Sequence, residues 1–343
     1  MKKFLALTLA LVMSLSLVAC GSKEETPAEG GETPAEGTAD FSVAMITDYG
    51  DITDQSFNQT TYEACKAYCE ANGVTFNYFK PAGDSTAERV AMVESAVDEG
   101  YNVIVMPGYA FADTIKETAE TYPDVTFVAL DVGEGDLGDY TLPSNVYCAV
   151  YQEELCGYMA GYAAVKMGYT HVGFLGGMAV PAVVRYGYGF VQGADAAAAD
   201  LGTTVTVEYV YGNAFAGDAD ITAYMDNWYQ TLGVEVVFAC GGGIYTSAAE
   251  APTVEHILSE IAAGNFANYG GKIETLGLVS GDDPTANYVQ LPMESTQWTD
   301  SFPQDNYKEL VKSMFDGTIT VSNDTTAMPA TTAVTVNEYG NIK

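Results

Sequence analysis

The chain has 343 residues, of which 48% are hydrophobic, and it carries a formal net charge of −33 at pH 7. This length accommodates two domains of ordinary size, and the apolar content is enough for a large core. So negative a protein repels nucleic acid and anionic lipid headgroups, and its charge disfavours a polyanionic ligand. A neutral or cationic small molecule is the better candidate, although solubility outside a cell would explain the acidity equally well.

The first twenty residues have the pattern of a secretory signal. Lys2 and Lys3 precede an apolar run at residues 4–18, and small residues surround Cys20. The run is shorter than the ~20 apolar residues that a transmembrane helix needs. Cys20 and its neighbours resemble the lipobox of bacterial lipoproteins. This resemblance implies that the signal is removed, that the Cys20 thiol is acylated, as by palmitate, and that lipid anchors the protein to the outer face of the cell membrane.

A low-complexity segment follows the cysteine. Residues 21–39 contain no large apolar side chain and repeat the motif Glu-Thr-Pro-Ala-Glu-Gly at 25–30 and 32–37. A segment of this composition cannot bury enough surface to offset its ordering entropy. We therefore expect a signal peptide at residues 1–19 and a lipidated cysteine with a disordered tether at residues 20–40.

Short β-branched runs then alternate with helical patterns. In the first half we expect strands at residues 41–46, 74–79, 102–106, 125–130 and 145–150, and helices at 56–72, 85–99 and 111–122. In the second half we expect helices at 153–166, 181–199, 218–232 and 247–263, and strands at 171–175, 203–210, 235–239 and 275–279. This alternation is typical of βαβ units and of parallel sheets that helices cover on both faces.

The pattern restarts after Val150, so we expect an α/β protein with two consecutive doubly wound parallel sheets. Strands of the first half end at Asp48, Tyr109 and Asp131, whereas strands of the second half end at glycine runs and at residues 282–283. Ligands of open parallel sheets bind beyond the carboxyl ends of the strands. Two such edges facing each other would form a cleft lined with carboxylates, glycines and aromatic rings.

The sequence lacks the motifs of common enzyme classes, among them G-x-S-x-G, H-E-x-x-H and the P-loop. Its two histidines, His171 and His256, are expected to be structural. The acidic loop at residues 131–139 has the wrong glycine spacing for an EF-hand calcium site, so we interpret it as a solvated loop. We expect no metal, no cofactor and no enzymatic activity.

Besides Cys20, the sequence contains Cys65, Cys69, Cys148, Cys156 and Cys240. An odd number of cysteines is not a disulfide framework. Cys65 and Cys69 are four residues apart on an expected helix, but no histidine is near them and the spacing fits no zinc pattern. We expect buried or free thiols.

Three segments at strand ends combine the residue types of a small-molecule site. In residues 48–59, the carboxylate of Asp48 follows a strand and Phe57 opens a helix. Phe57 could pack as a hydrophobic staple or present a flat face to a planar ligand. Ser56 and Asn58 are suited to cap the same helix, which is their structural alternative to a role in binding.

The other two segments follow the same plan. Within residues 107–113, Tyr109 and Asp113 lie between a strand and a helix. Gly241 and Gly242 belong to a run of three glycines, whose bare backbone allows a ligand to approach a helix N-terminus closely.

Several of these segments together resemble the signatures of the basic membrane protein family. The matching residues, in chain order, are 47–59, 107–116, 122–125, 172–178 and 240–243. Members of this family are substrate-binding lipoproteins of ABC importers, similar to the purine nucleoside receptor A type. The resemblance extends from about residue 41 to residue 317.

The resemblance implies a type I periplasmic-binding-protein fold, in which a three-crossing hinge joins two lobes and the ligand lies between them. We expect residues 41–150 and about 284–317 to form the first lobe. Residues 151–283 and about 318–343 would form the second lobe.

The resemblance also implies roles for particular side chains. Phe57 from one lobe and Phe215 from the other would sandwich a nucleoside base, with Tyr211 as a rival for the second position. Asp48 and Asp113 would accept hydrogen bonds from the base or the ribose.

Further residues are expected around the same ligand. Ser56 and Asn58 would line the wall beside Phe57, and Asp282 would bind the ribose hydroxyl groups. Where family members carry a lysine near the ribose, residues 294–301 contain no basic side chain, and Trp298 or Gln297 would occupy that place.

The leading hypothesis is thus a monomeric, lipid-anchored binding protein that closes on a neutral nucleoside, with a purine base expected, and delivers it to an ABC permease. The alternative from another class is a surface hydrolase of nucleosides or glycosides that uses paired carboxylates such as Asp48 and Asp113. A third hypothesis is a ligand sensor or adhesin that reuses the same fold.

Overall fold

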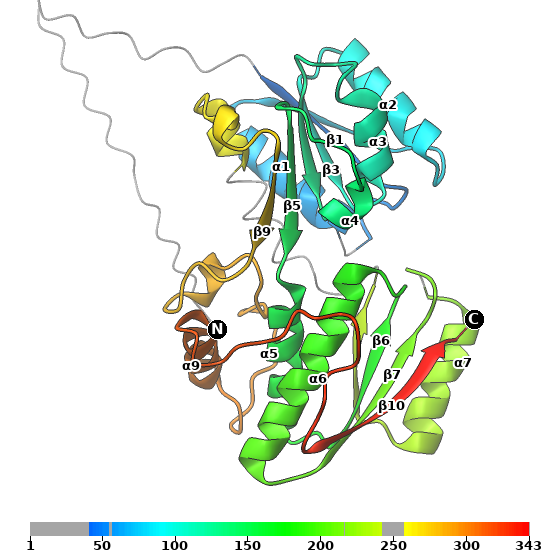
Figure 1. Ribbon diagram of the computed structural model, residues 1–343, viewed down its shortest axis with the longest axis vertical. Helices are drawn as coiled ribbons and strands as arrows, with labels where there is room; N and C mark the ends of the chain where they lie inside the picture. Colours follow the sequence, from blue (N-terminus) through cyan, green and yellow to red (C-terminus); the bar gives the residue numbers. More distant parts are fainter. Residues whose placement is uncertain (1–40, 55–56, 216, 242–256, 343) are drawn as a thin grey trace, which may run out of the picture. The chain divides into compact units, whose positions relative to one another are not determined.

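The computed structural model describes residues 41–54, 57–215, 217–241 and 257–342 of the chain (Figure 1). The expected signal peptide, Cys20 and the tether lie outside these ranges, as do Ser56, Gly242 and His256. The described residues contain two parallel sheets of six and four strands, with helices against both. None of the helices among them is long and apolar enough to cross a membrane.

The six-stranded sheet has the order β2-β1-β3-β4-β5-β9, and every neighbouring pair is parallel. Its strands are β1 (Ser42–Ile46), β2 (Thr75–Phe79), β3 (Val103–Pro107), β4 (Thr126–Leu130), β5 (Val146–Tyr151) and β9 (Lys272–Leu276). The helices of this part are α1 (Phe57–Asn72), α2 (Thr86–Asp98), α3 (Phe111–Thr118) and α4 (Glu134–Leu137).

Helices cover both faces of this sheet (Figure 1). On one face, α2 and α3 pack against residues such as Ile104 and Phe127. On the other face, α1 and the helical residues 257–262 pack against neighbours such as Val105 and Val128. Because both faces are buried, β3 is apolar along its whole length, as expected for a parallel strand.

The four-stranded sheet has the order β10-β7-β6-β8 and is also parallel throughout. Its strands are β6 (His171–Gly176), β7 (Val205–Tyr211), β8 (Val236–Cys240) and β10 (Val334–Asn341). Its helices are α5 (Glu153–Lys166), α6 (Pro181–Leu201), α7 (Ala219–Asn227) with the π-helical turn Trp228–Leu232, and α9 (Gln304–Phe315). Two 3-10 turns flank β9: Phe266–Asn268, which packs against the first sheet, and Pro284–Ala286.

The chain passes between the two sheets three times, after β5, after β8 and after β9. Two details of the sequence analysis are wrong. The strand expected at residues 275–279 is β9, which pairs with β5 in the first sheet and not with the second. Residues 304–315, expected with the first lobe, form α9, whose apolar face packs against α5. An apolar run indicates a strand or a helix, but its partner depends on contacts distant in sequence.

Glycines bring the backbones of α5 and α6 into direct contact. Gly157 and Gly161 on α5 face carbonyl groups of α6, and Gly189 and Gly193 on α6 face carbonyl groups of α5. A Cβ at any of these positions would overlap a backbone atom of the other helix; at Gly161 that atom is the carbonyl oxygen of Phe190. The two helices therefore pack at a separation that only glycine permits.

The five cysteines of the described residues are free and buried, as the sequence analysis expected. Burial raises the pKa of Cys69 to about 11 and those of Cys148 and Cys156 to about 12. Because the thiolate is the reactive form, these side chains behave as small apolar groups of the core.

A buried carboxylate joins three strands of the second sheet. Glu208 on β7 contacts the Nε2 of His171 on β6 at 2.7 Å, and it accepts hydrogen bonds from Asn337 at 3.1 Å and Tyr339 at 2.6 Å on β10. This contact agrees with the structural role expected for His171. Burial by itself would raise the pKa of Glu208, but the hydrogen bonds outweigh it and the pKa lies below its ordinary value.

Replacing Gly161 by alanine should destabilise the protein by about 3 kcal/mol, because the added Cβ meets a backbone oxygen that cannot rotate away. Gly135→Ala on α4 is the control, since a Cβ there meets no atom within 4 Å. Urea denaturation of both variants measures the difference. Equal stability of the two variants would show that α5 and α6 can separate at little cost.

The hydrogen bonds of Glu208 should make the free energy of unfolding depend on pH in the acidic range. Since the folded pKa is lowered, the ionised carboxylate stabilises the fold above its ordinary pKa of 4.5, and this contribution disappears as the pH falls through the folded pKa. Glu208→Gln should be less stable than the wild type at pH 7 and should lose less stability on acidification. Urea denaturation at several pH values tests this, with Glu70→Gln on the exposed side of α1 as control. Parallel pH profiles for wild type and Glu208→Gln would contradict it.

Candidate functional site

The residues expected at the carboxyl ends of the first sheet lie close together. Asp48, Tyr109 and Asp131 follow β1, β3 and β4, which are neighbours in the sheet. Burial raises the pKa of Tyr109, and the nearby carboxylates of Asp84, Asp48 and Asp131 raise it further. Asp131 also has a positive φ of 60°, a conformation that costs free energy for a residue other than glycine and that is enriched at functional sites.

Asp48 is held by a compact loop. Its Oδ1 accepts hydrogen bonds from the backbone N–H groups of Tyr49 at 2.5 Å and Gly50 at 2.7 Å, and from Nδ2 of Asn58 at 2.9 Å. Asn58 is 3% exposed; it also donates to Asp54 at 2.8 Å and accepts from the backbone N–H of Asp48 at 3.1 Å. Both amide hydrogens of Asn58 are thus used within the loop. These contacts hold the loop in place and are not the helix cap that the sequence suggested for Asn58; a backbone N–H of α1, that of Gln59, donates instead to Asp54 at 3.1 Å.

The other carboxylate proposed from the sequence is more exposed. Asp113 lies in the first turn of α3, its side chain is 65% exposed, and it pairs with Lys116 at 2.9 Å. The same lysine donates to the carbonyl oxygen of Asp136, which connects α3 to α4.

Both aromatic residues expected to stack on a ligand contact one core cluster. Phe57, the first residue of α1, and Phe215, between β7 and α7, are partly buried and pack against the cluster of the second sheet. Phe215 lies over two glycines: a Cβ at Gly177 would be 2.5 Å from its ring, and one at Gly241 would be 3.0 Å away. The strand-end glycines therefore make room for Phe215.

Tyr211, the rival for the second stacking position, is part of β7 and is involved in other contacts. Its hydroxyl lies 2.9 Å from the hydroxyl of Tyr209, and its ring packs edge-on against Phe174. Tyr211 is therefore held by contacts within the sheet, whereas Phe215 lies beyond the end of β7.

Trp298 and Asp282 have different surroundings from Phe57 and Phe215. Trp298 donates its indole N–H to the carbonyl oxygen of Met293 at 3.0 Å and stacks on Tyr307 at a centroid distance of 5.1 Å, within the cluster that α5 and α9 form. The side chain of Asp282 is 93% exposed and lies 3.9 Å from Lys312. The structure thus uses Trp298 for packing, and it leaves the carboxylate of Asp282 in solvent.

Sequence analysis missed an ion pair beside the strand ends. Arg185 on α6 donates to Glu153, a buried residue on the first turn of α5, at 2.5 Å. Burial raises the pKa of Asp131 well above its ordinary range; Glu153 raises it further and Arg185 opposes the rise. Cys240, at the end of β8, interacts electrostatically with both Asp131 and Glu153. Strand ends of both sheets therefore come within electrostatic reach of one another.

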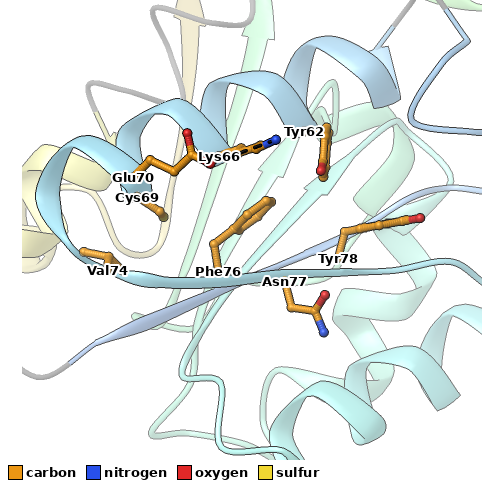
Figure 2. Close-up of a pocket in the computed structure, with 8 residues that line it drawn as sticks. All are labelled: Tyr62, Lys66, Cys69, Glu70, Val74, Phe76, Asn77 and Tyr78. Carbon is orange, nitrogen blue, oxygen red and sulfur yellow. Dashed lines mark ion pairs between the residues drawn. The ribbon is translucent and has the colours of Figure 1, made fainter.

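A separate groove lies between α1 and the edge strand β2 (Figure 2). Tyr62 packs against the rings of Phe76 and Tyr78, at centroid distances of 5.7 and 5.3 Å, and Lys66 pairs with Glu70. None of its eight lining residues belongs to the strand-end segments. No group of three or more side chains suited to hold a metal ion occurs within the described ranges.

Comparison with known proteins decides the family. The sequence model of PnrA-like ABC transporter substrate-binding proteins, the Bmp family, matches residues 41–257. The chain belongs to the Bmp family. The matched residues include Asp48, Phe57 and Phe215, whereas Asp282 and Trp298 lie beyond them. The chain is therefore a Bmp-type substrate-binding protein, a class that works outside the cytoplasm.

Two relatives illustrate the relation to other Bmp proteins. The chain is 29% identical to the "CD4+ T-cell-stimulating antigen" of Listeria innocua over 71% of its own length and 66% of the relative's. It is 26% identical to the "ABC transporter nucleoside-binding protein BmpA" of Lactococcus lactis over 81% of its length and 74% of the relative's.

Solved structures agree on the fold. A solute-binding protein of Conexibacter woesei superposes with a TM-score of 0.61 at 22% identity, covering 82% of this chain and 99% of that one. A solute-binding protein of Aeropyrum pernix gives a TM-score of 0.56 at 19% identity and covers 83% and 88%. The fold is thus the type I periplasmic-binding fold that the resemblance implied.

The loop around Asp48 should depend on the amide of Asn58. Asn58→Asp replaces the donor by a carboxylate oxygen that faces Asp48 and Asp54, so like charges meet in a buried position. We expect the free energy of unfolding to fall by about 2–4 kcal/mol at pH 7. Urea denaturation measures it, with Asp51→Asn, an exposed partner of Lys80, as the matched control. A stable Asn58→Asp variant would mean that the network does not order the loop.

Proposed function

We propose that this Bmp-family protein binds a neutral nucleoside, with a purine base, and delivers it to an ABC permease. The observation that carries the proposal is the placement of two aromatic rings. Phe57 and Phe215 are 158 positions apart by residue number yet pack against the same core cluster of the second sheet. Each ring retains exposed surface, and a planar base between two rings gains stacking and apolar burial.

The carboxylates that follow strands of the first sheet suit a ligand rich in hydroxyl and amino donors. Among the described residues, Oδ1 of Asp48 accepts the hydrogen bonds to this carboxylate, and Oδ2 lies toward Gly108, directly after β3. The carboxylate of Asp113 is largely exposed. Carboxylate oxygens accept hydrogen bonds from base or ribose donors, and they disfavour a phosphorylated ligand by charge repulsion. A nucleoside therefore fits better than a nucleotide.

The lipid anchor and the monomeric state belong to the same proposal. The lipobox-like sequence at Cys20 supports attachment to the membrane, and two archaeal relatives carry the name lipoprotein. Membership of a family of ABC transporter substrate-binding proteins supports delivery to a permease. The hydrolase hypothesis finds less support, because the two relatives described above are named for nucleoside binding or for antigenicity and not for an enzymatic activity.

Isothermal titration with a panel of nucleosides, free bases and nucleotides tests the proposal. We expect a dissociation constant in the micromolar range or below for a purine nucleoside, weaker binding of the free base, and no detectable binding of the monophosphate. Absence of binding to every nucleoside and base would exclude the proposal, whereas release of free base during the titration would favour the hydrolase.

The two aromatic rings should each contribute to affinity. Phe215→Ala and Phe57→Ala are expected to weaken binding of the preferred nucleoside about tenfold or more, from lost stacking and apolar burial. Tyr229→Ala is the control, because that ring is exposed outside the strand-end segments. Wild-type affinity of both phenylalanine variants, with folding intact by circular dichroism, would place the ligand elsewhere.

A further inference from the structure

One buried cation contacts three segments that follow strands of the first sheet. Arg89 lies on the first turn of α2, and its side chain is 6% exposed. Its Nη1 donates to Oδ1 of Asp84 at 2.7 Å and to the main-chain carbonyl oxygen of Asp48 at 3.5 Å. Its guanidinium carbon lies 5.9 Å from the centroid of the Phe111 ring.

The three contacts belong to segments that follow neighbouring strands. Asp48 follows β1, Asp84 follows β2, and Phe111 begins α3 after β3. Since β2, β1 and β3 are consecutive in the sheet, these segments form one side of the strand-end edge. A single side chain therefore connects the loop that carries the Asp48 carboxylate to both of its neighbours.

Burial of this guanidinium has a cost that its contacts only partly offset. Among the described residues, Asp84 is the one carboxylate that pairs with Arg89. The Nε of Arg89 is buried without a hydrogen-bond partner. Removing a cation from water costs several kcal/mol unless its donors are satisfied. Arginine also brings a planar group that can stack on a ring while it donates sideways, which lysine cannot do.

We propose that Arg89 is a positioning residue of the ligand site: it holds the main chain of Asp48 in place against the Asp84 and Phe111 segments. The proposal rests on the function proposed above, because the Asp48 segment is part of the nucleoside site. In this role Arg89 acts on the ligand through the Asp48 segment.

A second cation at the same edge provides a matched control. Lys80, directly after β2, pairs with Asp51 in the Asp48 loop at 2.8 Å, and both side chains are about half exposed. Exposed pairs of this kind contribute little. Arg89→Met and Lys80→Met each remove one positive charge that bridges the same two loops, but only Arg89→Met removes the buried contacts.

We expect Arg89→Met to weaken binding of the preferred nucleoside about tenfold, the equivalent of one lost hydrogen bond to a charged group, and Lys80→Met to change it less than about twofold. Titration calorimetry measures both, and urea denaturation verifies that the variants are folded. Wild-type affinity of Arg89→Met, or equal losses in the two variants, would overturn the proposal. If Arg89→Met does not fold, Arg89→Lys replaces it, and wild-type affinity of that variant would likewise overturn it.

A readout without ligand separates this proposal from the proposed function. The pKa values of Tyr49 and Tyr109 are raised mainly by burial, and Arg89 opposes the rise. In Arg89→Met both tyrosines should therefore titrate at a higher pH than in the wild type. NMR of 13Cζ-labelled tyrosine measures these titrations, and the two Tyr→Phe variants assign the signals. Absence of nucleoside binding by the wild type would refute the proposed function alone; unmoved tyrosine titrations would refute the positioning role.

Discussion

The close contact between α5 and α6 is the constraint on which much of the second half depends. Four glycines allow the two backbones to touch, and the contact places the first turn of α5 beside residues 185–189 of α6. That arrangement pairs Glu153 with Arg185 directly after the chain leaves the first sheet at β5. It also places Tyr186 and Phe190 in the core cluster against which Phe57 and Phe215 pack. The separation of α5 and α6 thus determines the position of the core residues on which Phe57 and Phe215 pack.

Parallel pairing supplies the other organising constraint. Because all strands of a parallel sheet run in one direction, their carboxyl ends share an edge, and polar residues that follow them must crowd together. Here the crowded groups are mostly acidic, namely Asp48, Asp84 and Asp131. Asn58 offsets part of the repulsion by donating two hydrogen bonds, and Arg89 supplies a buried positive charge. The edge is therefore a polar network with a defined geometry, which a binding site for an uncharged ligand requires.

Much of the fold is predictable from local pattern. Alternating apolar strands and helices up to β8 appear within a few residues of their expected places, since burial on both faces requires continuous apolar runs. The partner of a strand is not local information, so β9 was assigned to the wrong sheet. The helix α9 and the strand β10 were not expected, because their sequences are more polar and they gain stability from packing on α5 and pairing with β7.

By itself, the sequence determined the fold class and the strand-end position of Asp48 and Tyr109, because these follow from composition and from the order of elements. Only the tertiary structure decided which of the predicted site residues are already engaged in contacts within the protein. It directed the amide of Asn58 to its own loop, packed Trp298 on Tyr307, and placed Phe215 over two glycines. The reason is physical: hydrogen-bond partners and packing neighbours come from residues far apart in the chain, and no local pattern records them.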